Sequence, residues 1–451
     1  MTKLFPASQY SKGRSRAVDT ETIVNMFAEL QSPAAKDIFV LYGRPGLTLK
    51  AEVGTGPIRG QMMMGDALYV VSGSKVYRVL SDWTSTELGS ISGTGLVSMT
   101  TNGIHMAVTT STGDAYLVTS SAVAIISDPD LPEVYTCDYI DGYTIFSAKD
   151  GRFYTSGLLN STAIDPLDFA TAESYPDDLL RVFVDHREVW MFGTESIEVW
   201  YNAGLTNPPL ARFNDAIIEK GLFSRFSVTK NDNTVFWMAN DGIVYKAVSY
   251  APQRISTHAV EEDIASWTEA EMFSFVLKGH TFIVLSSTNG TWVYDVSVGL
   301  WYKWNSLNLK YWQVTSYVKA HGVHLVGSGL DGKLYELSLE KFTDNSTTIR
   351  SEIDLPLIHS NRDRAVMHSF EVDIESGVGL TDGSDPQIML RYSDDGFTWS
   401  SEFTRSMGKI GEYKKRAIWR MLGPDFRQRT IRLAITDPVK RVIISHYANI
   451  S

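Results

Sequence analysis

The sequence predicts an all-β protein: a β-propeller preceded by an N-terminal arm and followed by an antiparallel β-sandwich. Two observations predict this class. The first is a hairpin that recurs seven times in the middle of the chain, at spacings of 37 to 47 residues. The second is an alternation of apolar and polar residues in the final part of the chain. A period of about 40 to 50 residues is typical of propeller blades, and period-two alternation is typical of strands with one wet face.

Each repeated hairpin begins with a run of almost only apolar residues. Such runs indicate strands that are buried on both faces, and we expect them to be inner strands of the blades. The turns that follow contain Gly, Asn or Asp, which tolerate the positive φ of tight turns. The returning strands end in an aromatic residue. The first strands lie at residues 68–72, 105–109, 144–147, 189–193, 235–239, 282–286 and 324–328.

The propeller is expected to run from residue 52 to residue 343. Seven hairpins predict seven blades, with six as the alternative if the first or last hairpin completes a shared blade. A general β-sandwich meander is the other alternative for this region. Residues 260–267 are expected to form a short helix between blades, and the spacing of Thr268 and Glu271 fits a capping box.

Residues 1–51 lack the hairpin periodicity and are expected to form an arm. Alternating hydrophobic residues at 23–27 and 38–42 indicate segments that dock on another surface. That surface is either the chain's own propeller or a neighbouring subunit.

Residues 344–451 are expected to form the sandwich. Apolar and polar residues alternate at 370–374, 388–392 and 431–435. The segment SDDGFTW at 393–399 resembles the Asp-box turn of sialidases and other β proteins. Its carboxylate and hydroxyl can bond the amides of the turn while Trp399 packs beneath, so we interpret it as a fold-stabilising hairpin with no catalytic role.

Composition excludes several classes of protein. The 451 residues include 41 Lys and Arg against 52 Asp and Glu, a net charge of −11, so the whole molecule lacks the broad positive field that nonspecific DNA binding needs. The single cysteine, Cys137, cannot form an intrachain disulfide, and we expect it to be buried. The N-terminus lacks the apolar stretch of a signal peptide, and no segment approaches the roughly 18 apolar residues of a membrane helix. We expect synthesis in a cytoplasm and no membrane insertion.

Sequence signatures of catalysis are missing. The chain has no phosphate-binding loop, no dinucleotide-binding glycine motif, no HExxH metal motif and no GxSxG nucleophile elbow. His321 and His324 are three residues apart, which places them on opposite faces of a strand and makes a poor metal site. We therefore expect a protein that is not an enzyme and has no cofactor or metal.

Basic residues gather near the C-terminus. From Lys409 to Arg441, ten basic residues accompany three acidic ones, so this segment carries +7 and the remainder of the chain −18. Such polarity suits a subunit whose basic end meets an acidic partner surface. The alternative is a solvated strand face with its arginines outside. The candidate partner-interface residues are Lys409, Lys414, Lys415, Arg416, Arg420, Arg427, Arg429 and Arg432.

Short motifs follow one another along the chain. They are VNMFAE at 24–29, RPGL at 44–47, GLVSM at 95–99, ESIEVW at 195–200, EKG at 219–221, GKIGEYKKR at 408–416, WR at 419–420 and IRLAITDP at 431–438. In their order, they resemble the packaged-DNA stabilisation proteins of short-tailed bacteriophages, also called tail hub or nozzle proteins.

The resemblance implies a structural protein of the virion tail. It implies a ring of six copies beneath the portal and its adaptor that retains packaged double-stranded DNA and conducts it during ejection. It also implies contacts with the portal-adaptor protein, with a tail needle or plug, and with a tailspike or fibre. A closed ring requires a heterologous interface, which two β domains and an arm can supply. An acidic lumen would let the duplex slide, because it offers few cations to hold phosphates.

The competing hypothesis is a host-surface propeller protein that binds or hydrolyses carbohydrate. Propellers often present loops to ligands, and the chain has 52 Phe, Trp and Tyr residues that could stack on sugars. A sugar-binding test discriminates between the two hypotheses.

Overall fold

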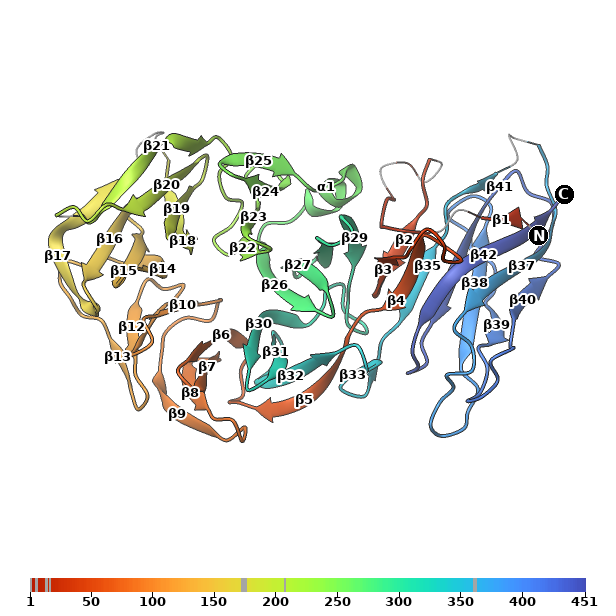
Figure 1. Ribbon diagram of the computed structural model, residues 1–451, viewed down its shortest axis with the longest axis horizontal. Coiled ribbons are helices and arrows are strands. Elements are labelled where there is room, and N and C mark those ends of the chain that lie inside the picture. The colour runs from red at the N-terminus through yellow and green to blue at the C-terminus, as the bar shows by residue number, and fades with distance from the viewer. Residues whose placement is uncertain are drawn as a thin grey trace.

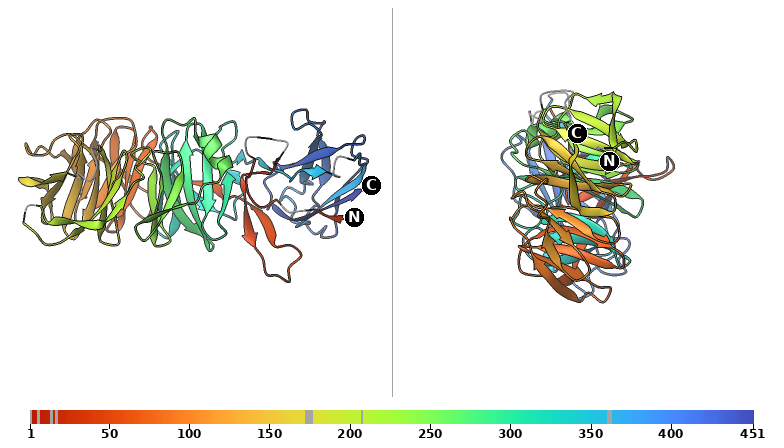
Figure 2. Two further views of the ribbon diagram at one scale, coloured as in Figure 1. Left: turned by 90° about the horizontal axis from the view of Figure 1, so that it is seen from above. Right: turned by 90° about the vertical axis from the view of Figure 1, so that its left-hand side faces the viewer.

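The chain folds into a flat, elongated molecule in which a β-propeller and a β-sandwich lie side by side (Figure 1, Figure 2). The structure is a computed structural model, and it describes residues 2–4, 7–12, 15, 18–171, 177–206, 208–359 and 363–451. Among these residues, α1 (His258–Ile264) is the one α-helix, and strands make up most of the rest. The predicted all-β class is confirmed.

Seven blades surround the propeller axis, and each consists of four antiparallel strands (Figure 1). In six of the blades the strands follow one another in sequence order from the axis outward. First strands of adjacent blades pack against one another around the axis, as β10 does against β14 and β30 against β6.

Six blades are each built from four consecutive strands. The first blade contains β6 (Ile58–Met64), β7 (Ala67–Ser72), β8 (Lys75–Val79) and β9 (Ser85–Ser90). The second blade contains β10 (Ser98–Thr101), β11 (Met106–Thr109), β12 (Ala115–Val118) and β13 (Val123–Ile125). The third blade contains β14 (Val134–Ile140), β15 (Tyr143–Ala148), β16 (Arg152–Gly157) and β17 (Asn160–Thr171). The fourth blade contains β18 (Leu179–Asp185), β19 (Glu188–Gly193), β20 (Ile197–Asn202) and β21 (Leu210–Ile218). The fifth blade contains β22 (Val228–Asn231), β23 (Thr234–Met238), β24 (Val244–Val248) and β25 (Ala251–Arg254). The sixth blade contains β26 (Glu271–Leu277), β27 (His280–Ser287), β28 (Gly290–Asp295) and β29 (Leu300–Lys303).

The seventh blade closes the ring with a strand from the start of the chain. β30 (Val314–Ala320), β31 (Val323–Ser328) and β32 (Lys333–Ser338) form its inner part, and β5 (Gly46–Glu52) pairs antiparallel with β32 as the outer strand. All of β5 except its last residue lies inside the range 1–51 that we expected to be the arm, so the last part of that range belongs to a propeller blade. The hairpins therefore correspond to seven blades.

The apolar runs of the repeat form the second strand of each blade. All six residues of β7 are buried, and so are all four residues of β11. We expected these runs to be inner strands, but the structure places one further strand between each of them and the axis. A second strand is paired on both edges and covered on both faces by adjacent blades, which explains its near-continuous hydrophobicity.

The sandwich consists of two packed sheets. One has the strand order β3-β4-β42-β37-β40, with β1 on the free part of β42, and the other has the order β2-β35-β41-β38-β39, with β36 on β41. Their strands are β1 (Thr2–Lys3), β2 (Thr22–Val24), β3 (Met26–Leu30), β4 (Phe39–Gly43), β35 (Ser351–Asp354), β36 (Ile358–His359), β37 (Met367–Ile374), β38 (Gln387–Ser393), β39 (Phe403–Ser406), β40 (Ala417–Arg420), β41 (Gln428–Ile435) and β42 (Val442–Ile450).

The N-terminal segment joins the two domains. β2 pairs with β35 of the sandwich and meets β29 of the sixth blade at Val24 and Lys303, so a continuous sheet runs from the propeller into the sandwich. The short strands β33 (Thr343–Asp344) and β34 (Thr347–Thr348) follow β32 in sequence, and β33 pairs with β5 while β34 pairs with β33. One apolar core cluster extends from blades six and seven through the arm into the sandwich. The hairpin of β3 and β4 projects out of the flat molecule (Figure 2).

The helix begins earlier than the sequence suggested. Thr257 is its N-cap and accepts a hydrogen bond from the Val260 amide, and the helix ends at Ile264. The expected capping box at Thr268 and Glu271 is wrong, because Glu271 is the first residue of β26. The helix lies between blades five and six, as expected (Figure 1).

Candidate interaction surfaces

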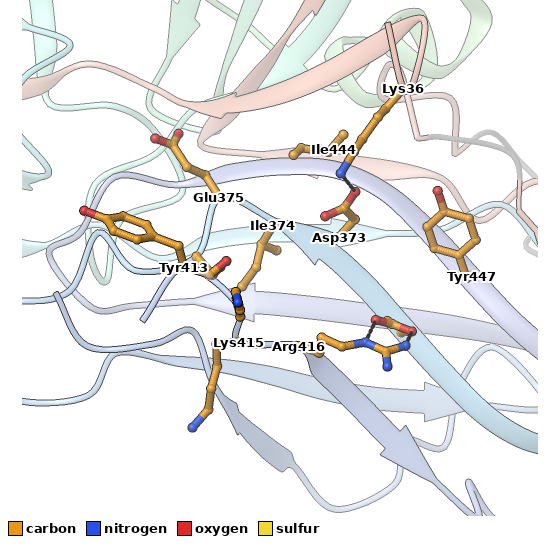
Figure 3. Close-up of a pocket in the computed structure, with 12 residues that line it drawn as sticks. Lys36, Asp373, Ile374, Glu375, Tyr413, Lys415, Arg416, Ile444 and Tyr447 are labelled. Carbon is orange, nitrogen blue, oxygen red and sulfur yellow. Dashed lines mark hydrogen bonds and ion pairs between the residues drawn. The ribbon is translucent and has the colours of Figure 1, made fainter. Parts of the chain in front are cut away.

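A groove of about 670 Å³ lies on the outer face of the sandwich (Figure 3). Its floor comes from β37 and β42, which contribute Asp373, Ile444 and Tyr447. One wall is the turn between β3 and β4, which carries Lys36. The other wall is residues 407–416, the connection between β39 and β40, which we call the basic loop.

Each carboxylate of the groove has a cationic partner. Three pairs form: Lys36 with Asp373 at 3.0 Å, Arg416 with Glu371 through two contacts of 2.6 Å, and Lys440 with Glu375 at 2.8 Å. The hydrogen bond to Asp373 raises the pKa of Lys36, and the hydrogen bond to Glu371 raises the pKa of Arg416. Figure 3 shows Lys415 extending away from these pairs. Its charge therefore faces solvent.

The basic loop is held in place by its own backbone and by residues 376–379. The Gly411 amide donates to the Gly377 carbonyl at 3.1 Å, and the Ser376 hydroxyl donates to the Tyr413 carbonyl at 2.9 Å. Gly379 has a φ of +58°, and a Cβ there would lie 2.2 Å from the Ile410 backbone nitrogen. Only glycine fits so close to the loop.

The structure brings together four of the eight residues that the sequence singled out. Lys409, Lys414, Lys415 and Arg416 are all exposed on the basic loop. Arg420, at the end of β40, and Arg427, just before β41, are exposed but do not line the groove.

Arg429 has a structural role. Its side chain is 0% exposed, and its guanidinium makes a bidentate pair with Asp394 at 2.6 and 2.9 Å. It also donates to the carbonyls of Leu422 and Pro424. Arg429 fits neither a partner interface nor a solvated strand face, because its side chain is buried inside the sandwich.

Arg432 is also engaged within the chain. It pairs with Asp354 at 2.6 and 2.8 Å and lies 4.2 Å from the centre of the Trp399 ring. Asp395 accepts the amides of Phe397 and Thr398, and these hydrogen bonds hold the pKa of its carboxyl well below its usual range. Segment 393–399 therefore stabilises its own hairpin, as its resemblance to an Asp box implies.

One face of the propeller is strongly acidic. Because strands alternate in direction, the turns between second and third strands and the connections between blades share one face, which we call the acidic face. The described segments of the acidic face hold fifteen acidic and four basic residues. The described turns of the opposite face hold four acidic and two basic residues. The exposed acidic residues are Asp130, Glu133, Asp150, Asp178, Glu195, Glu219, Asp241, Glu262 and Glu269.

The sequence reasoning missed this face and the groove residues Lys36, Glu371 and Asp373. The range 52–343 holds 33 acidic and 19 basic residues, which gives it a net charge of −14. An acidic residue recurs in the hairpin turns at Asp114, Asp150, Asp241 and Asp331. The recurrence of an acidic residue in these turns is a sequence pattern from which the acidic face could be predicted.

Other expected features can be located in the structure. Cys137 is buried, and burial raises the pKa of its thiol to about 12. In the described part of the chain, no three His, Cys, Asp or Glu side chains are grouped so that they could hold a metal ion. No helix among the described residues has the length and apolarity to span a membrane.

Two family models match the chain, one for a β-propeller and one for a β-sandwich, and the first also covers β2, β3 and β4, which the structure places in the sandwich sheets. Residues 12–341 match the β-propeller of bacteriophage P22 Gp10, and residues 350–451 match its β-sandwich. The chain belongs to the bacteriophage P22 Gp10 family. This confirms the resemblance to phage DNA-stabilisation and tail hub proteins, and it makes the chain a phage structural protein.

Other comparisons add little to the P22 Gp10 assignment. A comparison with curated proteins gives no match. The WD40 propeller domain of Doa1 is similar at a TM-score of 0.43 and 13% identity, over 65% of this chain and 96% of that one. The computationally designed Ika8 protein is similar at a TM-score of 0.42 and 15% identity, over 70% and 100%.

Proposed function

We propose that the protein is the tail hub or nozzle subunit of a short-tailed phage. Six copies close into a ring beneath the portal and its adaptor, retain packaged double-stranded DNA, and conduct it during ejection. The observation that carries this proposal is the match of the chain to both P22 Gp10 domains, in order and over nearly its whole length. The portal-adaptor protein, a tail needle or plug, and a tailspike or fibre are the partners that belong to this proposal.

The shape and charge of the molecule support a ring. A closed ring needs two unlike surfaces on each copy that fit one another. The flat molecule carries an acidic propeller at one end and a sandwich with an exposed basic loop at the other (Figure 1). Strand β2 and the shared core join the domains, so the two surfaces keep a fixed spacing.

The charge of the propeller also supports conduction of DNA. Proteins hold DNA mainly through lysine and arginine contacts to phosphates. Residues 52–343, with a net charge of −14, repel the duplex. DNA that passes along the propeller is therefore not bound to its surface during ejection. In this proposal the protein conducts DNA through its charge and shape, without covalent chemistry.

Cryo-electron microscopy of the purified protein, with mass photometry beside it, tests the proposal. We expect a closed ring with a channel that admits duplex DNA, alone or after an adaptor protein is added. A protein that stays monomeric with the adaptor present, or a monomer that binds duplex DNA tightly, would overturn it. A glycan array with the same preparation tests the carbohydrate hypothesis.

A further inference from the structure

Two surfaces of opposite charge lie on different domains of the chain. The basic loop leads into β40, on the side of the sandwich remote from the propeller (Figure 1). The acidic face belongs to the turns and connections of the blades. β2 and the shared apolar core join the two domains, so each copy presents both surfaces at once.

The basic loop has cations to offer a partner. In the part of the chain that the structure describes, Lys409, Lys414 and Lys415 are exposed and form no ion pair, whereas Lys36 and Arg416 are already paired. A carboxylate from another molecule would therefore find unneutralised charge at the rim of the groove.

The basic loop also offers apolar contact area. Tyr413 is 75% exposed and Ile410 is 61% exposed. Tyrosine is enriched at protein interfaces. The hydrogen bonds that pin the loop to residues 376–379 reduce the entropy lost when it binds.

We infer that the basic loop and its groove dock on the acidic face of a neighbouring copy. This inference rests on the proposed ring and names the two surfaces that meet in it. Each copy presents both surfaces, so the contact is heterologous and repeats from copy to copy until the ring closes. Complementary charge fixes the orientation and speeds the encounter, and salt weakens it.

Zero-length cross-linking tests which surfaces meet. A carbodiimide joins a lysine amine to a carboxylate in direct contact, and mixing unlabelled with ¹⁵N-labelled protein identifies links between copies. We expect mixed-isotope links from Lys409, Lys414 or Lys415 to acidic-face residues such as Asp130, Asp178 or Glu269. Links only to other surfaces would overturn the inference.

Charge reversal tests whether the contact drives assembly. The variant Lys414→Glu/Lys415→Glu should associate about tenfold more weakly or worse in sedimentation velocity, and Lys414→Arg/Lys415→Arg should associate as wild type does. Reversal of the acidic face should weaken association equally, and both reversals in one chain should restore it. The acidic-face variant is Asp130→Lys/Asp178→Lys/Glu269→Lys, and its matched control on the opposite face is Asp66→Lys/Asp82→Lys/Asp232→Lys.

The outcomes separate this inference from the proposed function. If the Lys414→Glu/Lys415→Glu protein is folded by circular dichroism and still forms rings with wild-type affinity, the ring stands and the docking inference is wrong. If the wild-type protein forms neither rings nor mixed-isotope links with the adaptor present, the proposed function fails, and the inference with it. If the same variant loses binding to duplex DNA while its self-association is unchanged, the loop contacts DNA and the inference is overturned.

Discussion

Arg44 and Asp344 are 300 residues apart in the sequence and form a bidentate ion pair at the junction of the two domains, at 2.9 and 2.6 Å. Their side chains are 0% and 2% exposed. The same guanidinium donates to Asn25 Oδ1 at 2.9 Å and to the Asn305 carbonyl at 3.0 Å. The arm, the connection between blades six and seven, and the interdomain linker therefore meet at one buried charge cluster.

Arg44→Met should destabilise this junction strongly. The substitution leaves the carboxylate of Asp344 buried without a cation, which costs about 3–5 kcal/mol of unfolding free energy. Denaturant unfolding monitored by tryptophan fluorescence measures the change. Arg44→Met/Asp344→Leu should recover part of the loss, because it removes both charges. Lys75→Met, which breaks an exposed pair with Glu87, should leave the unfolding midpoint unchanged, and a similar midpoint for Arg44→Met would contradict this account.

His280 links the arm to the sixth blade through two carboxylates. Asp295 lies 2.5 Å from its Nδ1, and Glu29 of β3 lies 3.5 Å from its Nε2. Burial alone would lower the pKa of His280, but the two carboxylates outweigh it, and the net shift is upward from 6.5.

The stabilisation from His280 should therefore decrease at alkaline pH. A raised folded-state pKa gives a contribution that is complete below pH 6.5 and is lost as pH rises through the folded-state value. The difference in thermal midpoint between wild type and His280→Gln should shrink as pH rises above neutral. His359→Gln, at an exposed histidine, is the control. A difference that does not change with pH would show that His280 contributes only by packing.

His446 should produce the opposite slope. It is 2% exposed, neither ring nitrogen has a hydrogen-bond partner among the described residues, and burial lowers its pKa to about 4 against an opposing effect of Asp37. The unfolded chain binds a proton at this residue below about pH 6.5 and the folded chain does not, so stability falls as pH decreases from 6.5 towards 4. His446→Phe should lose less stability than wild type between neutral and mildly acidic pH in urea unfolding. Equal losses in the two proteins would contradict the prediction.

The sequence was most informative where structure is local. The repeat could be recognised because the second strand of each blade is paired on both edges and covered on both faces. Consecutive residues of such a strand are therefore buried and apolar, as in β7 and β11. Closure of the seventh blade by β5 has no such signature, because its partner β32 lies far along the chain. The helix start was missed because a second capping pattern, at Thr268 and Glu271, competes with the true cap at Thr257.

Charge shows the same limit for the candidate site. A count along the sequence finds the basic segment, but it cannot tell that β41 buries Arg429 while the loop before β40 exposes Lys415. The acidic face becomes visible only when strand order shows which turns share a side of the propeller. A surface assembled from many turns has no single motif, which is why the sequence predicted an acidic remainder of the chain without locating it on one face of the propeller.

Arg429 and Lys415 were candidates of one kind in the sequence, and they should behave differently on substitution. Arg429→Ala removes a buried guanidinium that pairs with Asp394 and lies 4.3 and 4.1 Å from the ring centres of Tyr392 and Phe426. We expect a loss of roughly 3 kcal/mol or more of unfolding free energy, because the interaction with Asp394 and the packing against both rings are lost together. Lys415→Ala should leave stability unchanged within about 0.5 kcal/mol, since the side chain is exposed, and should weaken only the association between copies. Urea unfolding and sedimentation velocity on both variants measure the two effects, and an unfolding midpoint for Arg429→Ala equal to that of Lys415→Ala would return Arg429 to the candidate interface.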